Sequence, residues 1–222
     1  MWQHRRWYKN GRIPIGRNKM QAVVDFFQIA ERLECEYRLT RMSDGQNQSV
    51  ASHSWNMAMM AMVLRPYLVV DVDMVRVYQM CLLHDLPEAI AHDIPLHEQN
   101  DAVRAQKHIQ ETAAINQILS LLDKNDDVRA CFDEYEARNS PEARLVKALD
   151  VLDTGVQHMC AKDLSYVGEY NNNFYWKMFF SDDFIRFFDF EPALRDVMCE
   201  IRRRVANRMK NELGIDVQRD IK

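Results

Sequence analysis

Glycine and proline are scarce in this chain of 222 residues, which has only six of each. A β-sandwich or β-barrel needs many tight turns, so this scarcity argues against both. No apolar run reaches the roughly 18 residues that a membrane span needs. The charged N-terminus also lacks the apolar core of a signal peptide. We therefore expect a helical protein of the cytoplasm that does not bind membranes.

Cysteine is present, but not in a pattern that suggests a metal ribbon or a disulfide framework. The chain has an odd number of cysteines, with wide spacing and no C-x-x-C motif. The five are Cys35, Cys81, Cys131, Cys160 and Cys199. We expect free, buried thiols in a reducing compartment.

The net charge of −4 gives no reason to expect a nucleic-acid partner. Residues 1–19 carry six basic and no acidic side chains, which leaves −10 on the remainder. This basic arm could contact a phosphate or an acidic partner, although a solvated terminus is the favoured interpretation. The acidic remainder would repel a polyanion, so nucleic-acid binding is unfavoured.

Helical periodicity dominates the long segments, and no stretch alternates with period two long enough to demand a strand. Three residues are candidate N-caps of helices: Ser52, Asp73 and Ser140. Pro141 stands at the first helical position after Ser140, and Gly214 is a candidate C-terminal end of a helix. The expected helices lie within residues 20–33, 52–64, 71–85, 100–122, 140–164 and 191–214. The sequence predicts an all-α bundle of about six or seven helices, forming one domain over residues 20–214, with a tail at 215–222.

Aromatic side chains crowd the segment 166–190. They could stack on a nucleobase, or they could pack between helices or at a subunit contact. Burial is the usual way in which Phe and Trp contribute to stability, so core packing is favoured.

Candidate metal ligands occur on three of the expected helices. His53 follows the start of one, His84 and Asp85 end the next, and Asp150 lies near the apolar stripe of a third. A second His-Asp pair, His92 and Asp93, follows shortly. Two imidazoles and two carboxylates form a borderline site that suits Mn, Fe, Co, Ni, Zn or Mg. Open positions on such an ion would suit metal-assisted hydrolysis.

Four short motifs, SVASHSW, LLHDLPEA, AHDIP and LVKALD, together resemble the HD-domain phosphohydrolase superfamily, and within it the YfbR-like 5′-deoxynucleotidase branch. The likeness runs from about residue 38 to residue 153. It implies an HD-type helical bundle that holds one divalent ion through His53, His84, Asp85 and Asp150. The apolar run before His84 also favours the first His-Asp pair as the buried one, and His92 has no counterpart in the family.

The same resemblance implies roles for further residues. Glu88 matches the catalytic carboxylate, although Pro87 makes its helical register uncertain. Asp93 matches a carboxylate near the substrate, assigned here to catalysis and binding. Arg38 and Lys147 match positions that would bind phosphate, and an arginine can do so bidentately.

The chain departs from the family pattern at two positions. Leu39 stands where these deoxynucleotidases have Trp, and it is assigned to substrate binding. Ser52 stands where the broader family often has Glu before the first His. Sugar and base selectivity therefore do not follow from the resemblance.

The implied activity is hydrolysis of deoxynucleoside 5′-monophosphates to nucleoside and phosphate. A deoxynucleoside triphosphate triphosphohydrolase would use the same site, and the basic arm modestly favours it. A non-catalytic nucleotide-binding protein is the third alternative. A small-molecule nucleotide is the expected partner, and a homo-oligomer, dimeric or larger, is compatible with this interpretation.

Overall fold

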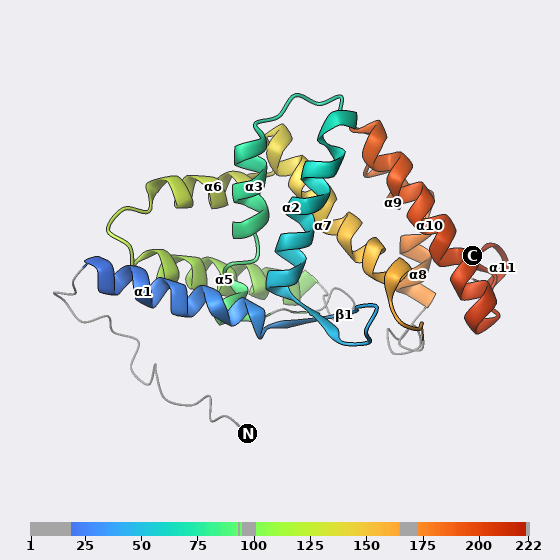
Figure 1. Cartoon of the computed structure of the whole chain (residues 1–222), viewed down its shortest axis with the longest axis horizontal. Helices are drawn as coiled ribbons and strands as arrows, with labels where there is room; N and C mark the ends of the chain where they lie inside the picture. The colour runs from blue at the N-terminus through green and yellow to red at the C-terminus, as the bar shows by residue number, and fades with distance from the viewer. Residues whose placement is uncertain (1–18, 93, 95–100, 165–172, 221–222) are drawn as a thin grey trace, which may run out of the picture.

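The computed structural model describes residues 19–92, 94, 101–164 and 173–220 (Figure 1). Several predicted features lie wholly or partly outside the described residues: residues 1–18 of the basic arm, Asp93, residues 166–172 of the aromatic segment and the last two residues of the tail. Within them, no helix is both long and apolar enough to cross a membrane.

The described residues form a helical bundle, as the sequence predicts. Seven of their helices have ten or more residues: α1 (Lys19–Ala30), α2 (Val50–Leu64), α3 (Met74–Leu83), α5 (Asp101–Leu119), α6 (Asp126–Ala137), α7 (Pro141–Cys160) and α10 (Pro192–Leu213). The shorter ones are α4 (Glu88–Ala91), α8 (Asn173–Phe179), α9 (Asp182–Arg186), α11 (Val217–Asp220) and the 3-10 helices η1 (Glu31–Glu34) and η2 (Arg65–Tyr67).

Two short strands, β1 (Tyr37–Arg41) and β2 (Asn47–Ser49), pair antiparallel between η1 and α2. The sequence does not predict these strands, because each of them is too short to show a clear period-two pattern. The strands matter for the site, since Arg38 lies on β1 and the chain passes from β2 directly into α2.

Helix α7 is the centre of the bundle and packs against α2, α3, α6 and α10 (Figure 1). Its start is the one predicted: Ser140 accepts a hydrogen bond from the backbone N–H of Ala143, and Pro141 is the first helical residue. The face of α7 toward its neighbours is apolar, with Leu145, Leu149 and Leu152 fully buried. A polar side chain on this helix is therefore held in place by packing on several sides.

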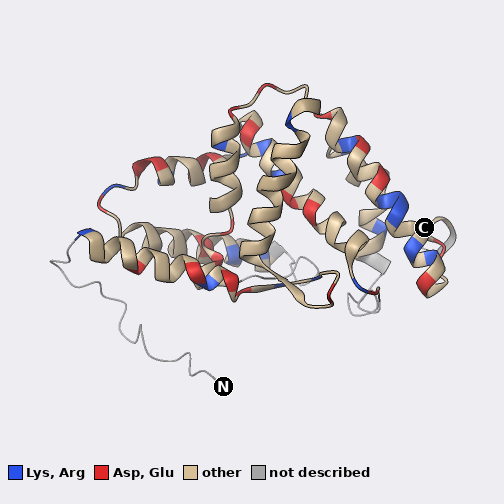
Figure 2. Ribbon diagram, in the orientation of Figure 1, with Lys and Arg blue, Asp and Glu red and all other residues tan. Residues whose placement is uncertain are grey.

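Helix α2 carries no Lys, Arg, Asp or Glu side chain (Figure 2). It begins three residues earlier than predicted, because Ser49 rather than Ser52 is its N-cap and accepts a hydrogen bond from the Ser52 backbone N–H. Ser52 is thus already inside the first turn, next to His53. This corrects the predicted start and places His53 within the first turn of the helix.

The described part of the aromatic segment packs in the core, as favoured from the sequence. Trp176, Phe179 and Phe188 are buried within the cluster that surrounds α7. The expectation of buried thiols was wrong for three of the five cysteines. Cys35, Cys160 and Cys199 are exposed, and only Cys81 and Cys131 are buried. All five are free, as expected.

Candidate metal centre

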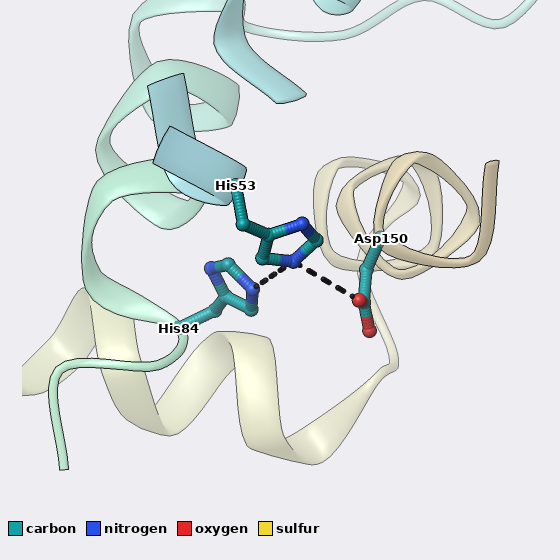
Figure 3. Close-up of side chains that lie close together, drawn as sticks. All are labelled: His53, His84 and Asp150. Carbon is teal, nitrogen blue, oxygen red and sulfur yellow. Dashed lines mark hydrogen bonds and ion pairs between the residues drawn. The ribbon is translucent and has the colours of Figure 1, made fainter. Parts of the chain in front are cut away.

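Three helices bring His53, His84 and Asp150 together (Figure 3). His53 lies in the first turn of α2, His84 caps the C-terminus of α3, and Asp150 lies midway along α7. The His53 Nε2 atom is 3.3 Å from His84 Nε2 and 3.2 Å from Asp150 Oδ1. One potential ligand atom from each residue lies within 4.8 Å of the others.

Asp85 completes the set of four predicted ligands. Its Oδ2 atom is 3.0 Å from His84 Nε2 and 3.8 Å from His53 Nε2. The chain therefore brings His53, His84, Asp85 and Asp150 into one cluster, although residues 53 and 150 are far apart in the sequence.

Hydrogen bonds on the far side of each imidazole determine what the near side offers. His53 Nδ1 lies 2.6 Å from Asp153 Oδ2, and His84 Nδ1 lies 3.0 Å from the carbonyl oxygen of Cys81. A carboxylate and a carbonyl can only accept, so each Nδ1 carries the proton. In a neutral imidazole the Nε2 atom is then bare and is a ligand atom.

Because of this tautomer, both imidazoles can offer an Nε2 lone pair to a metal ion. Two bare Nε2 atoms face each other at 3.3 Å, with the oxygens of Asp85 and Asp150 beside them. These electron-pair donors lie close together, and their mutual repulsion is relieved by a cation or a proton between them. Two nitrogen and two oxygen donors suit a borderline divalent ion, so the residues fit one.

Asp153 contacts the candidate centre directly but is not among the residues that the sequence singles out. It is fully buried and holds His53 from behind, while Gln48 Nε2 donates to the same Oδ2 atom at 2.9 Å. Asn56 and Gln157 donate to Oδ1. Its spacing could have indicated this contact. Asp153 follows Asp150 by three residues, so the two side chains lie on nearly the same side of an apolar helix.

The electrostatics of the cluster keep its carboxylates ionised. Burial alone would raise the pKa of Asp150, but Lys147, His53 and Arg38 hold that pKa well below its usual value. The pKa of Asp85 is likewise lowered, because the neighbouring His84 outweighs burial. Burial and Arg38 would lower the pKa of His53, yet the neighbouring carboxylates of Asp150 and Asp153 raise it. The site therefore attracts positive charge.

The two predicted phosphate-binding cations contact the ligand carboxylates. Arg38 Nη1 lies 3.6 Å from Asp85 Oδ2, its Nη2 lies 3.9 Å from Asp150 Oδ1, and Nη2 also donates to Thr154 at 3.3 Å. Lys147 Nζ is 2.7 Å from Asp150 Oδ2. Both cations therefore lie beside the candidate ligands.

Glu88 reaches the site region through a break in the helix. Helix α3 ends at Leu83, and tight turns carry the chain through Pro87 to Glu88, the first residue of α4. The Glu88 side chain is buried and lines the same cavity as His84 and Asp85. The break expected at Pro87 is therefore real, and it leaves Glu88 near the ligands.

The second His-Asp pair has a different environment. The His92 side chain is 73% exposed, and its Nδ1 atom pairs with Glu36 Oε2 at 2.9 Å. Its backbone has a φ of 67°, which is uncommon for a residue other than glycine. This geometry agrees with the first pair being the buried one, while Asp93 lies outside the described residues.

A cavity of about 910 Å³ opens beside the cluster. Its lining includes both charged and aromatic side chains. The basic ones are Arg38, Arg104, Lys107, Arg138 and Lys147, and the aromatic ones include Tyr175, Phe179, Phe184 and Phe187. Leu39 also lines the cavity and is 42% exposed. The sequence analysis did not single out Arg104, Lys107 or Arg138, because ordinary surface cations look the same in sequence.

The fold is a helical domain in which one His, one His-Asp pair and one Asp lie close enough together to be candidate ligands of a metal ion. The model of the HD domain family matches residues 30–180. The chain belongs to this family.

Known proteins resemble the chain over different lengths. It is 36% identical over 114 residues to a zebrafish (Danio rerio) protein named 5′-deoxynucleotidase HDDC2, covering 50% of this chain and 54% of the relative. The human HDDC2 protein is 32% identical over 121 residues, covering 54% and 57%. The chain thus matches a little over half the length of these relatives.

A solved structure resembles the chain over more of its length. The protein described as a "Predicted metal-dependent phosphohydrolase" from Magnetospirillum magnetotacticum is 25% identical, with a TM-score of 0.68, covering 89% of this chain and 97% of that one. A "Conserved hypothetical protein" from Pyrococcus furiosus is 27% identical, with a TM-score of 0.57, covering 81% and 99%.

Proposed function

We propose that the protein is a metal-dependent phosphohydrolase that converts deoxynucleoside 5′-monophosphates to nucleoside and phosphate. The observation that carries this proposal is the four-donor cluster of His53, His84, Asp85 and Asp150, with Arg38 against two of its carboxylates. The names of the HDDC2 relatives support the substrate class, and the Magnetospirillum structure supports the reaction class.

The four ligand side chains would hold one divalent ion per chain, from among Mn, Co, Mg, Zn, Fe and Ni. Such an ion would polarise a phosphoryl oxygen and lower the pKa of a water molecule. Arg38 and Lys147 would neutralise charge on the phosphate, and the planar guanidinium of Arg38 can pair with two phosphate oxygens at once.

Glu88 is the proposed proton-handling group. A water that attacks phosphorus must lose a proton, and a leaving alkoxide must gain one. A buried carboxylate beside the ligands can do both in turn. Asp93 is proposed to assist at the substrate, on the strength of the family resemblance alone.

The cavity supports a nucleotide as the substrate. Its volume of about 910 Å³ lies in the range of small-molecule sites. Phosphate would lie near Arg38 and Lys147, and the nucleobase would meet Phe184 and Phe187. Stacking accepts every base, so weak base selectivity is expected. Leu39, in place of the family's Trp, is proposed to leave the sugar less closely enclosed.

A triphosphohydrolase acting on deoxynucleoside triphosphates is the second candidate. Arg104 and Arg138 line the cavity in addition to Arg38 and Lys147. A triphosphate carries more negative charge than a monophosphate and would make use of these extra cations.

A product screen tests the proposal. The purified protein is incubated with deoxynucleoside mono-, di- and triphosphates and each of the six metals. Free phosphate is measured colorimetrically, and triphosphate is measured by ion-exchange chromatography. Phosphate from monophosphates supports the 5′-deoxynucleotidase, and triphosphate from triphosphates supports the second candidate. Binding without hydrolysis in every metal would show a non-catalytic nucleotide-binding protein.

A further inference from the structure

Glu88 is in contact with a lysine from another helix. Lys107 on α5 places its Nζ atom 3.1 Å from Glu88 Oε1. The same Nζ atom lies 3.1 Å from Glu111 Oε1, one turn further along α5. Helix α4 packs against α5, so two elements fix this contact.

The three side chains are buried to different degrees. Glu88 is 3% exposed, whereas Lys107 and Glu111 are 20% and 22% exposed. A buried carboxylate needs a charged or hydrogen-bonding partner to remain in place. Lys107 supplies one and is itself anchored on its other side by Glu111.

We propose that Lys107 is a positioning residue that fixes the carboxylate of Glu88 for proton transfer. This inference rests on the proposed function and adds to it a residue that acts through Glu88. Proton transfer requires the carboxylate to lie within hydrogen-bond reach of the reacting water. A side chain that rotates freely in the cavity satisfies this requirement only part of the time.

The charge of Lys107 is consistent with this role. Burial would lower its pKa, but Glu88 and Glu111 outweigh burial and raise the pKa above the usual value. The ammonium group therefore remains protonated at neutral pH and keeps its contact with Glu88.

A different reading of Lys107 is that it binds the substrate phosphate directly, because it also lines the cavity. Its Nζ atom already contacts two carboxylates, which offset its positive charge. Lys147 differs, because its partner Asp150 belongs to the candidate metal centre. The two readings predict different kinetics: a phosphate-binding lysine acts on KM, and a positioning residue acts on kcat.

Substitution of Lys107 separates these readings. Lys107→Met removes the contact, and kcat should fall at least about tenfold, up to the 10²–10⁴-fold loss expected for Glu88→Gln, with KM nearly unchanged. Lys107→Arg, which keeps a cation in reach, should recover most of kcat. Lys124→Met changes an exposed lysine beyond the end of α5 and should behave as wild type.

Metal content and melting temperature are measured on each preparation. The ion pairs of Lys107 are with Glu88 and Glu111 rather than with a proposed ligand, so the metal content of Lys107→Met should match wild type. Where this variant does not fold, Lys107→Gln replaces it, because its amide can still donate to Glu88. Lys107→Gln should also keep a nearly unchanged KM and the wild-type metal content, with a smaller loss of kcat.

A double substitution tests whether Lys107 acts through Glu88. In the Glu88→Gln background, Lys107→Met should cause no further loss of kcat. Wild-type kcat in Lys107→Met and Lys107→Gln, a raised KM with unchanged kcat, or fully additive losses would each overturn the inference. Failure of the wild-type protein to hydrolyse any nucleotide would instead overturn the proposed function on which it rests.

Discussion

At the scale of single residues, the candidate metal centre depends on what holds the far side of each imidazole. The Cys81 carbonyl that accepts the hydrogen bond from His84 Nδ1 belongs to the preceding helix, three residues away. The Asp153 carboxylate that accepts the hydrogen bond from His53 Nδ1 belongs to α7, 100 residues further along the chain. Second partners of this kind orient a ligating histidine and set its tautomer.

Asp153→Asn should weaken metal binding without abolishing it. The amide can still contact His53 but lacks the charge that fixes the tautomer, so metal affinity should fall by about 10–100-fold. Isothermal titration with the best activating metal measures this. Asp150→Ala, which removes a proposed ligand, should show no specific binding in the same assay. Equal affinity in Asp153→Asn and wild type would show that Asp153 only supports the fold.

The two His-Asp pairs provide a second test among single residues. His84→Ala should lose the metal, since His84 is buried beside His53. His92→Ala should keep the metal and most activity, since His92 is largely exposed and pairs with Glu36. Metal per chain is measured by elemental analysis after dialysis. Loss from the His92 variant and retention in the His84 variant would mean that the pairs have been assigned the wrong way round.

The resemblance in the sequence was sufficient to select His53, His84, Asp85 and Asp150, which lie together in the structure. It did not select Asp153 or Lys107. Their contacts join residues 100 and 19 positions apart. Single-sequence patterns report local periodicity and contain no information on which distant side chains meet.

At the scale of elements, strong local signals predicted the helices best. Asp73 and Ser140 cap α3 and α7 as expected, and Gly214 ends α10 with a φ of 71°. The start of α2 was misplaced because Ser49 and Ser52 are both plausible caps. Helix α6, with the sequence DDVRACFDEYEA, was not predicted, because its few apolar residues form only a short stripe.

The junction between α7 and α8 should be sensitive to acid. His158 on α7 is buried, contacts the Tyr175 hydroxyl of α8 at 2.8 Å and packs on the Trp176 and Phe179 rings. Burial lowers the pKa of His158 to about 3. The unfolded chain, with a His pKa near 6.5, binds a proton that the folded protein does not.

Stability should therefore decrease as pH falls below about 6.5 and continue to decrease toward pH 3, by up to about 1.4 kcal/mol per pH unit from this residue. Urea unfolding of metal-free protein between pH 7 and pH 4.5 measures the slope. His158→Gln lacks the titrating group, so its slope should be smaller than that of wild type. Identical slopes would show that His158 is protonated in the folded protein.

At the scale of the whole molecule, the candidate centre lies where three helices of the bundle meet. Helices α2, α3 and α7 pack against one another, and each contributes at least one proposed ligand. An unfolded chain does not hold His53, His84 and Asp150 together. An ion that binds these residues therefore binds the folded state in preference and stabilises it.

Metal removal should lower the melting temperature. At a free metal concentration 100 times Kd, binding stabilises the folded state by about 2.7 kcal/mol. For a domain of this size that corresponds to a shift of about 5–11 °C. Calorimetry of chelator-treated protein, with and without added metal, measures the shift. The Asp85→Ala/Asp150→Ala double variant is the control, because without two of its ligands it should melt at the same temperature in both conditions. If that variant still binds one ion per chain with wild-type affinity, the ion is held elsewhere and the assigned ligands are wrong.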